Sequence, residues 1–113
     1  MAAINYNNKK FKVAGTDDED VTVFKYFQSG NLVWGEYSGG SVKKGSLIAK
    51  ADDNDVLSMH YQHLNTNLEF KLGKCVSSPK ILEDGRIEIH EIYESIGVDP
   101  VSKGEITLIE IVD

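Results

Sequence analysis

Apolar and polar residues alternate along most of this chain, in segments about as long as a β-strand. In one segment, Arg86–Tyr93, Ile87 and Ile89 alternate with Glu88 and His90. Alternation with a period of two is typical of a strand, because successive side chains point to opposite faces of a sheet. No window of eleven or more residues repeats apolar positions at helical spacing. The pattern therefore predicts strands and no long helix.

Several such segments follow one another, and each ends in a short turn signal. The predicted strands are Val21–Gln28, Asn31–Ser38, Ser41–Ala51, Asp55–Asn65, Leu68–Ser77, Arg86–Tyr93 and Glu105–Val112, and Ile4–Tyr6 with Lys10–Val13 could add a first hairpin. The predicted links are Ser29-Gly30, Gly39-Gly40, Asp52-Asp53-Asn54, Thr66-Asn67, Glu83-Asp84-Gly85 and a longer connection, Ser95–Lys103. Links this short make consecutive strands antiparallel neighbours, because a parallel crossover needs a dozen or more residues.

The series amounts to eight to ten antiparallel strands in 113 residues. An open sheet of that width would leave two unpaired edges and one uncovered face, whereas closure into a barrel removes both problems. We therefore expect an all-β fold, an up-and-down antiparallel meander closing into a barrel of the general lipocalin or streptavidin type. It would form a single domain over residues 1–113. A two-sheet sandwich is the alternative.

Glycines are expected where this meander bends. Gly30, Gly35, Gly40 and Gly45 recur every five residues and are interpreted as bends of a strongly coiled sheet. Alternation can also break at a β-bulge, for which Gly73 is the first candidate. A bulge there would move Cys75 and Ser77 to the other face of their strand.

The composition narrows the classes of partner. The chain is 41% hydrophobic and 27% charged, as in an ordinary globular domain, and its net charge is −6. That charge repels nucleic acid and anionic membranes unless a basic patch is present, and the lysines are scattered. The single cysteine, Cys75, excludes an internal disulfide, and no stretch approaches the ~18 apolar residues of a membrane span. We expect a cytoplasmic protein that binds neither nucleic acid nor membrane.

Polar residues interrupt several strand faces that begin apolar. Leu57, Met59, Tyr61, His63 and Asn65 share one face, as do Ile87, Ile89, Glu91 and Tyr93, and as do Leu32, Trp34 and Glu36. If these faces point inward, one end of the barrel is apolar and the other is polar. Such a cavity suits a small ligand that carries a cation or several hydroxyls. The candidate ligand-binding residues are Trp34, Glu36, Tyr61, His63, Asn65, Arg86, Glu91 and Tyr93.

A second interpretation of the same residues is purely structural. Arg86, Glu36, Glu91 and His63 could pair with one another across the strands and fix the register of the sheet. In that case the polar end of the barrel is filled and binds no ligand.

Metal binding and nucleophilic catalysis have little support. His60 and His63 are three residues apart on a strand, so they point to opposite faces and cannot share an ion. His63 and His90 could share a face but are expected about two strand spacings apart. Cys75 could meet either His63 or His90 as a nucleophile with its base, but a lone cysteine on a strand is more often a small buried residue. No metal and no cofactor is predicted.

Five segments together resemble a family of short bacterial proteins that carries the name N-acetylglutamate synthase. They are Asn5-Tyr6-Asn7-Asn8 with Phe11, Val33–Gly40, Tyr61–Asn67, Gly73–Pro79, and Leu82–Ile87 with His90-Glu91. The resemblance implies an acetyltransferase. However, the Gln/Arg-x-x-Gly-x-Gly/Ala pattern that binds the coenzyme A pyrophosphate is missing from the sequence.

Three functions follow from these observations. The leading one is a non-enzymatic barrel that binds a small polar ligand at one end. The second is an interaction module or homodimer subunit that uses an exposed strand edge, because the run Ile106–Val112 is apolar on both faces. The third is the acetyltransferase that the resemblance implies.

Overall fold

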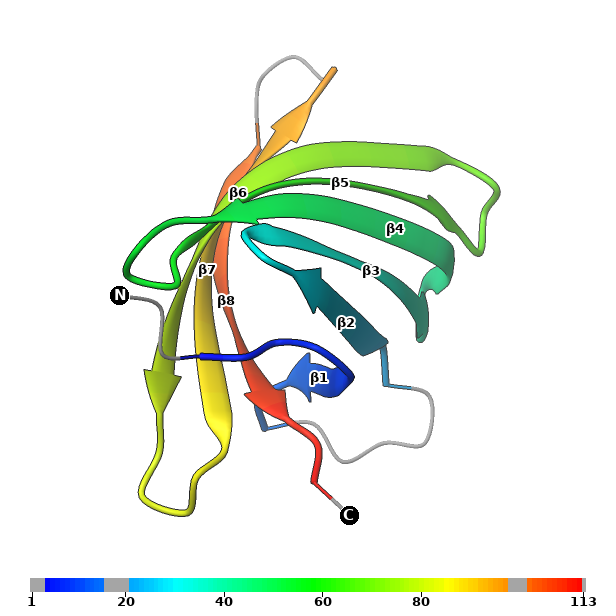
Figure 1. Cartoon of the computed structure of the whole chain (residues 1–113). Coiled ribbons are helices and arrows are strands. Elements are labelled where there is room, and N and C mark those ends of the chain that lie inside the picture. The colour runs from blue at the N-terminus through cyan, green and yellow to red at the C-terminus, as the bar shows by residue number, and fades with distance from the viewer. Residues whose placement is uncertain (1–3, 16–20, 98–101, 113) are drawn as a thin grey trace.

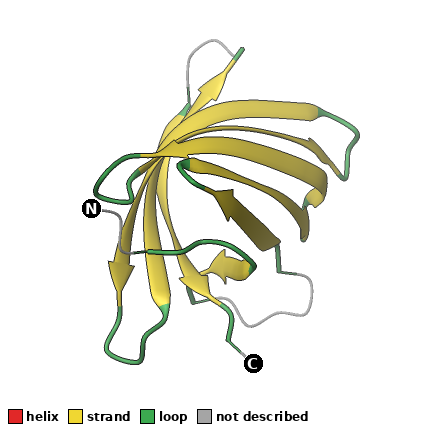
Figure 2. Cartoon of the chain, viewed as in Figure 1, coloured by secondary structure: helices red, strands yellow, loops and turns green. Residues whose placement is uncertain are grey.

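Eight antiparallel strands close into one barrel in the computed structural model, which describes residues 4–15, 21–97 and 102–112 (Figures 1 and 2). The strands are β1 (Lys9–Val13), β2 (Val23–Ser29), β3 (Leu32–Gly39), β4 (Val42–Ala51), β5 (Leu57–Asn65), β6 (Phe70–Ile81), β7 (Ile87–Ile96) and β8 (Lys103–Glu110). Each strand pairs with its neighbours in sequence, and β8 returns to pair with β1. None of the described residues belongs to a helix that could cross a membrane.

The predicted all-β barrel is therefore confirmed, and the sandwich alternative is wrong because no pairing is missing around the ring. Two strands are longer than expected: β6 continues through Pro79 to Ile81, and β7 continues to Ile96. The predicted first hairpin is wrong, since Ile4–Tyr6 lies outside the sheet and only β1 forms from this region. Part of the predicted connection Ser95–Lys103 lies outside the described residues.

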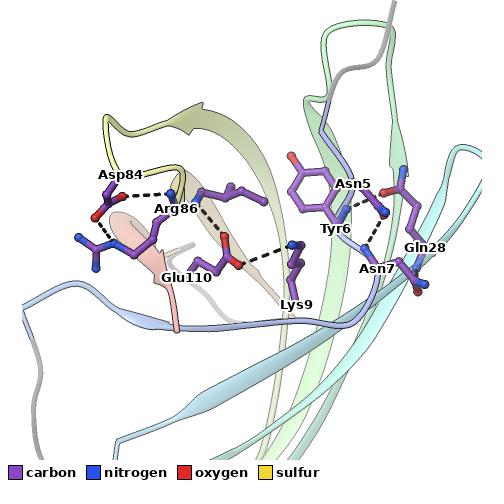
Figure 3. A network of polar contacts seen from close by, with 9 residues as sticks. Asn5, Tyr6, Asn7, Lys9, Gln28, Asp84, Arg86 and Glu110 are labelled. Carbon is purple, nitrogen blue, oxygen red and sulfur yellow. Dashed lines mark hydrogen bonds and ion pairs between the residues drawn. The ribbon is translucent and has the colours of Figure 1, made fainter. Parts of the chain in front are cut away.

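The N-terminal segment closes one end of the barrel. An up-and-down meander places the β2–β3, β4–β5 and β6–β7 turns at this end and the other links at the opposite end. The Tyr6 backbone N–H donates to the Gln28 side chain (2.8 Å), and the fully buried Tyr6 hydroxyl donates to the Asp55 carbonyl (2.7 Å). Gln28 lies near the end of β2 and Asp55 lies in the β4–β5 link, so Tyr6 ties two separate parts of this end together. Figure 3 shows the contact with Gln28.

The hydrophobic core fills the half of the barrel next to this closed end. Its fully buried side chains include Tyr6, Phe11, Tyr26, Val33, Leu57, Ile89 and Leu108. The Tyr26 ring packs against those of Phe11 and Tyr6, with centroids 4.9 and 6.0 Å apart. We call the half next to the closed end the lower half and the other the upper half. The packed lower half keeps the barrel rigid, and the upper half can therefore enclose a cavity.

The glycines occupy two kinds of position, in turns and inside strands. Gly30 and Gly40 lie in turns with φ of 60° and 61°, which agrees with their interpretation as bends. Gly35 and Gly45 are buried inside β3 and β4, away from the turns, and there the interpretation as bends stays a prediction. The bulge expected at Gly73 is absent from the continuous registers of β6. The sheet register shifts instead near the β3–β4 turn.

Candidate functional site

A cavity of about 240 Å³ occupies the upper half of the barrel, at the end opposite the N-terminal segment. All eight strands or the links next to them contribute side chains to it. The lining residues are Val13, Thr22, Phe24, Tyr26, Tyr37, Val42, Leu47, Met59, Tyr61, His63, Cys75, Glu91, Tyr93 and Ile106. Most of these are aliphatic or aromatic, and only a few polar atoms lie among them. This combination is typical of a small-molecule site.

Four predicted site residues meet in this cavity: Tyr61, His63, Glu91 and Tyr93. Tyr61 and His63 come from β5, and Glu91 and Tyr93 come from β7, in each case by the alternation that the sequence displays. The predicted inward direction of these two strand faces is confirmed by the structure.

Trp34 and Glu36 do not reach the cavity, so the inward direction predicted for them is wrong. On β3 the buried side chains are Val33, Gly35 and Tyr37, and Trp34 is 39% exposed on the outer face. Trp34 stacks there on Phe27, with ring centroids 5.9 Å apart. Both faces of β3 carry apolar residues, and the narrow interior takes the face with the smaller ones.

Asn65 and Arg86 also lie away from the cavity, because Asn65 is the last residue of β5 and Arg86 lies in the link just before β7. The Asn65 carboxamide oxygen accepts hydrogen bonds from the backbone N–H groups of Asn67 and Glu69 at 3.0 and 2.9 Å. The Arg86 guanidinium pairs with Asp84 at 2.7 Å at the closed end (Figure 3). Their predicted place in the site is therefore wrong. The alternative network of Arg86, Glu36, Glu91 and His63 does not form either.

Four cross-strand pairs of tyrosine and glycine build the aromatic wall. Tyr26 lies opposite Gly35, Tyr37 opposite Gly45, Tyr61 opposite Gly73, and Tyr93 opposite Gly104 in the register. In the last three pairs the tyrosine ring occupies the space that a side chain at the glycine would need. The rings therefore lie along the wall and do not fill the interior. Prediction from the sequence missed Tyr26 and Tyr37, because the pairing of each tyrosine with a glycine follows from the register of the sheet.

The Glu91 carboxyl, the acid among the described cavity-lining residues, is buried, since Glu91 is only 6% exposed. The Ser77 hydroxyl donates to Glu91 Oε2 at 2.7 Å, and the Cys75 thiol lies 3.9 Å from the same oxygen. The Tyr26 hydroxyl is close enough to help lower the pKa of Glu91, but its geometry falls short of a hydrogen bond. Burial outweighs these contacts, so the pKa of Glu91 is raised above its usual value.

The other titratable groups of the cavity are neutral at pH 7. Burial raises the pKa of Cys75 to about 12 and that of Tyr61 to about 12. Burial, with Lys71 nearby, lowers the pKa of His63, whose Nδ1 is hydrogen bonded to the Tyr37 hydroxyl at 3.0 Å. A neutral imidazole is the expected form, so Glu91 dominates the electrostatics of the cavity.

Neither a metal centre nor a nucleophile forms around these residues. The described residues hold no group of three His, Cys, Asp or Glu side chains that could bind a metal ion. The hydrogen-bond partners of the Cys75 thiol are Met59, Ser77 and Glu91. His90 lies on the outer face and pairs with Glu105 at 2.8 Å. What the cavity presents to a molecule is therefore its shape and one acidic group.

Comparison with known families agrees with this geometry. The family model described as Avidin-like protein matches residues 4–111. The chain belongs to the avidin-like family. No curated protein matches it, and no solved structure does. The closed antiparallel barrel fits this family, and the family and the cavity together are consistent with a barrel that binds a small ligand.

The buried acid of this avidin-like barrel is expected to reduce stability at neutral pH. Below the usual pKa of glutamate, about 4.3, Glu91 is protonated in both states. Above it the unfolded state loses the proton first, so the free energy of unfolding falls until the pH passes the raised pKa of the folded state. Glu91→Gln should therefore be more stable than the parent at pH 8, with no difference at pH 4. Urea unfolding at both pH values measures this, and a difference independent of pH would contradict it.

The tyrosine–glycine pairs make a second prediction. A methyl group at Gly73 would collide with the hydroxyl end of Tyr61 and drive that ring into the cavity. Gly73→Ala should cost about 1–3 kcal/mol of unfolding free energy, the usual range for overpacking. The same substitution should cost less than about 0.5 kcal/mol in a Tyr61→Ala background, because the colliding ring is gone. Equal costs in the two backgrounds would show that the ring is not involved.

Proposed function

We propose that the protein is a non-enzymatic binding protein that holds one small, ring-bearing molecule in the open half of its barrel. The observation that carries this proposal is the cavity, which has aromatic walls and a single buried acid at its base. Burial raises the pKa of the Cys75 thiol to about 12, so the thiol is protonated at pH 7, and its hydrogen-bond partners among the described residues include no histidine.

The volume sets the size of the ligand. An apolar cavity of about 150 Å³ holds benzene, and pockets for drug-sized ligands begin at about 300 Å³. At about 240 Å³, this cavity has room for one ring with a substituent. Members of the avidin-like family bind small ligands such as biotin, so biotin is one suitable probe. Indole, a neutral aromatic compound, is another.

Filling the cavity should abolish binding. Ile106→Trp on β8 places a large ring among the lining residues, whereas Glu105→Trp adds the same ring to the exposed outer face of that strand. We expect indole to bind the parent and Glu105→Trp with a Kd of about 1 mM or tighter. Ile106→Trp should weaken that binding at least about tenfold, or 1.4 kcal/mol. Amide chemical shifts measure the titrations, and failure of both indole and biotin to shift cavity residues would refute the proposal.

We also propose that the protein forms a homodimer, but through an outer face of the barrel. The predicted strand edge cannot serve, because β8 pairs with both β7 and β1. The outer face of the barrel instead exposes Ile48 on β4, Val76 on β6 and Ile92 on β7, whose exposed fractions are 58%, 48% and 56%. Val76 and Ile92 lie opposite each other in the register. Exposed apolar residues that cluster on one face are typical of interaction surfaces.

Light scattering tests this assembly. We expect the parent to be dimeric at micromolar concentration, and Val76→Glu to shift it to monomer because the substitution would bury an unpaired charge in the interface. Ser78→Glu adds the same charge two residues further along the same strand face and should leave the dimer intact. A parent that is monomeric at high concentration would refute the homodimer.

The resemblance to proteins named N-acetylglutamate synthase stays a prediction. The binding proposal does not depend on it, because the cavity and its residues stand without any reaction.

A further inference from the structure

The charge inside the cavity is one-sided. Among the described residues that line it, Glu91 is the only acid, and none is a lysine or arginine. His63, the one basic side chain there, is held in its neutral form by burial. A ligand that enters therefore meets one acid and, among the described lining residues, no group that carries a positive charge.

The polar atoms at the base of the cavity are incompletely paired. Ser77 occupies one oxygen of the Glu91 carboxyl at 2.7 Å, and no described residue donates a hydrogen bond to the other oxygen. The Tyr26 hydroxyl beside it is fully buried, with no hydrogen-bond partner in the part of the chain that the structure describes. Buried polar groups of proteins are normally paired. A ligand with N–H donors would satisfy both groups at once.

The walls above this base carry the electron-rich faces of several aromatic rings. Phe24 and Tyr37 stack with centroids 5.0 Å apart, and the rings of Tyr61 and Tyr93 lie along the opposite wall over their glycines. The face of an aromatic ring attracts a cation, and the attraction grows when the site is shielded from water. The net charge of −6 also favours the approach of a cation over that of an anion.

We propose that the ligand is a small organic cation, an ammonium group on a single ring or short hydrocarbon body. The ammonium lies between the Glu91 carboxylate and the tyrosine rings, donates to Glu91 and Tyr26, and leaves the hydrocarbon body against the apolar wall. This inference rests on the proposed binding function and specifies which chemical class that site takes.

Benzylamine and benzyl alcohol are a matched pair of probes. They have the same ring and the same number of non-hydrogen atoms, and both can donate a hydrogen bond, but only benzylamine is positively charged at pH 7. We expect benzylamine to bind the parent protein at least about tenfold more tightly, which corresponds to 1.4 kcal/mol. Amide chemical shifts of the cavity residues report both affinities.

Two variants assign the preference to the residues named. Glu91→Gln keeps the shape of the side chain and removes its charge, so the benzylamine preference should fall below about twofold while benzyl alcohol binds as before. Tyr61→Leu removes a ring face and should weaken benzylamine more than benzyl alcohol. Retention of the native circular dichroism spectrum serves as the control for folding in both variants.

The outcomes separate the two proposals. Equal binding of the two probes, or a preference that survives in Glu91→Gln, overturns the cationic ligand and leaves the binding function standing. If neither probe binds and indole and biotin also fail, both proposals are overturned.

Discussion

Antiparallel pairing between β1 and β8 is the interaction on which the rest of the structure depends. Only this contact joins the first strand of the meander to the last, and its register pairs just three residues of the five-residue β1 with β8. Without it the sheet would have two free edges and its inner face would be open to water. With it, every strand has two partners and the inward side chains share one interior. A cavity that all strands help to line exists only because the ring is complete.

Closure alone would give a filled barrel, because eight strands enclose little more space than their side chains need. Here the strand that follows each tyrosine-bearing strand carries a glycine opposite the tyrosine, so the rings can lie flat against the wall. The lower half, packed around Tyr26 and Leu57, supplies the stability that a hollow upper half cannot. Glu91 stands at the boundary between these halves, which is why it is both deeply buried and accessible to a ligand.

The sequence predicted the barrel and half of the candidate site residues, for identifiable reasons. Glu91 and His63 could be placed because each shares its strand face with apolar residues at every second earlier position, Ile89 before Glu91 and Met59 before His63. Trp34 was misplaced because both faces of β3 carry apolar residues, so alternation does not decide which one is inside. Asn65 and Arg86 were misplaced because both lie at the ends of strands. There the Asn65 side chain accepts from the backbone N–H of Glu69, and the Arg86 guanidinium donates to Asp84. Pairing of tyrosine with glycine depends on register, which a single sequence leaves open.

The segment around Tyr6 has a practical consequence for anyone who handles this protein. An even number of strands returns the chain to the side where it started, so β1 begins and β8 finishes next to the plug formed by Tyr6. Attachment to a bead or sensor chip through either terminus would therefore leave the mouth of the barrel facing the solution. The links at the mouth could be exchanged for longer ones without disturbing that anchor, which makes the molecule suitable as a scaffold for grafted recognition loops.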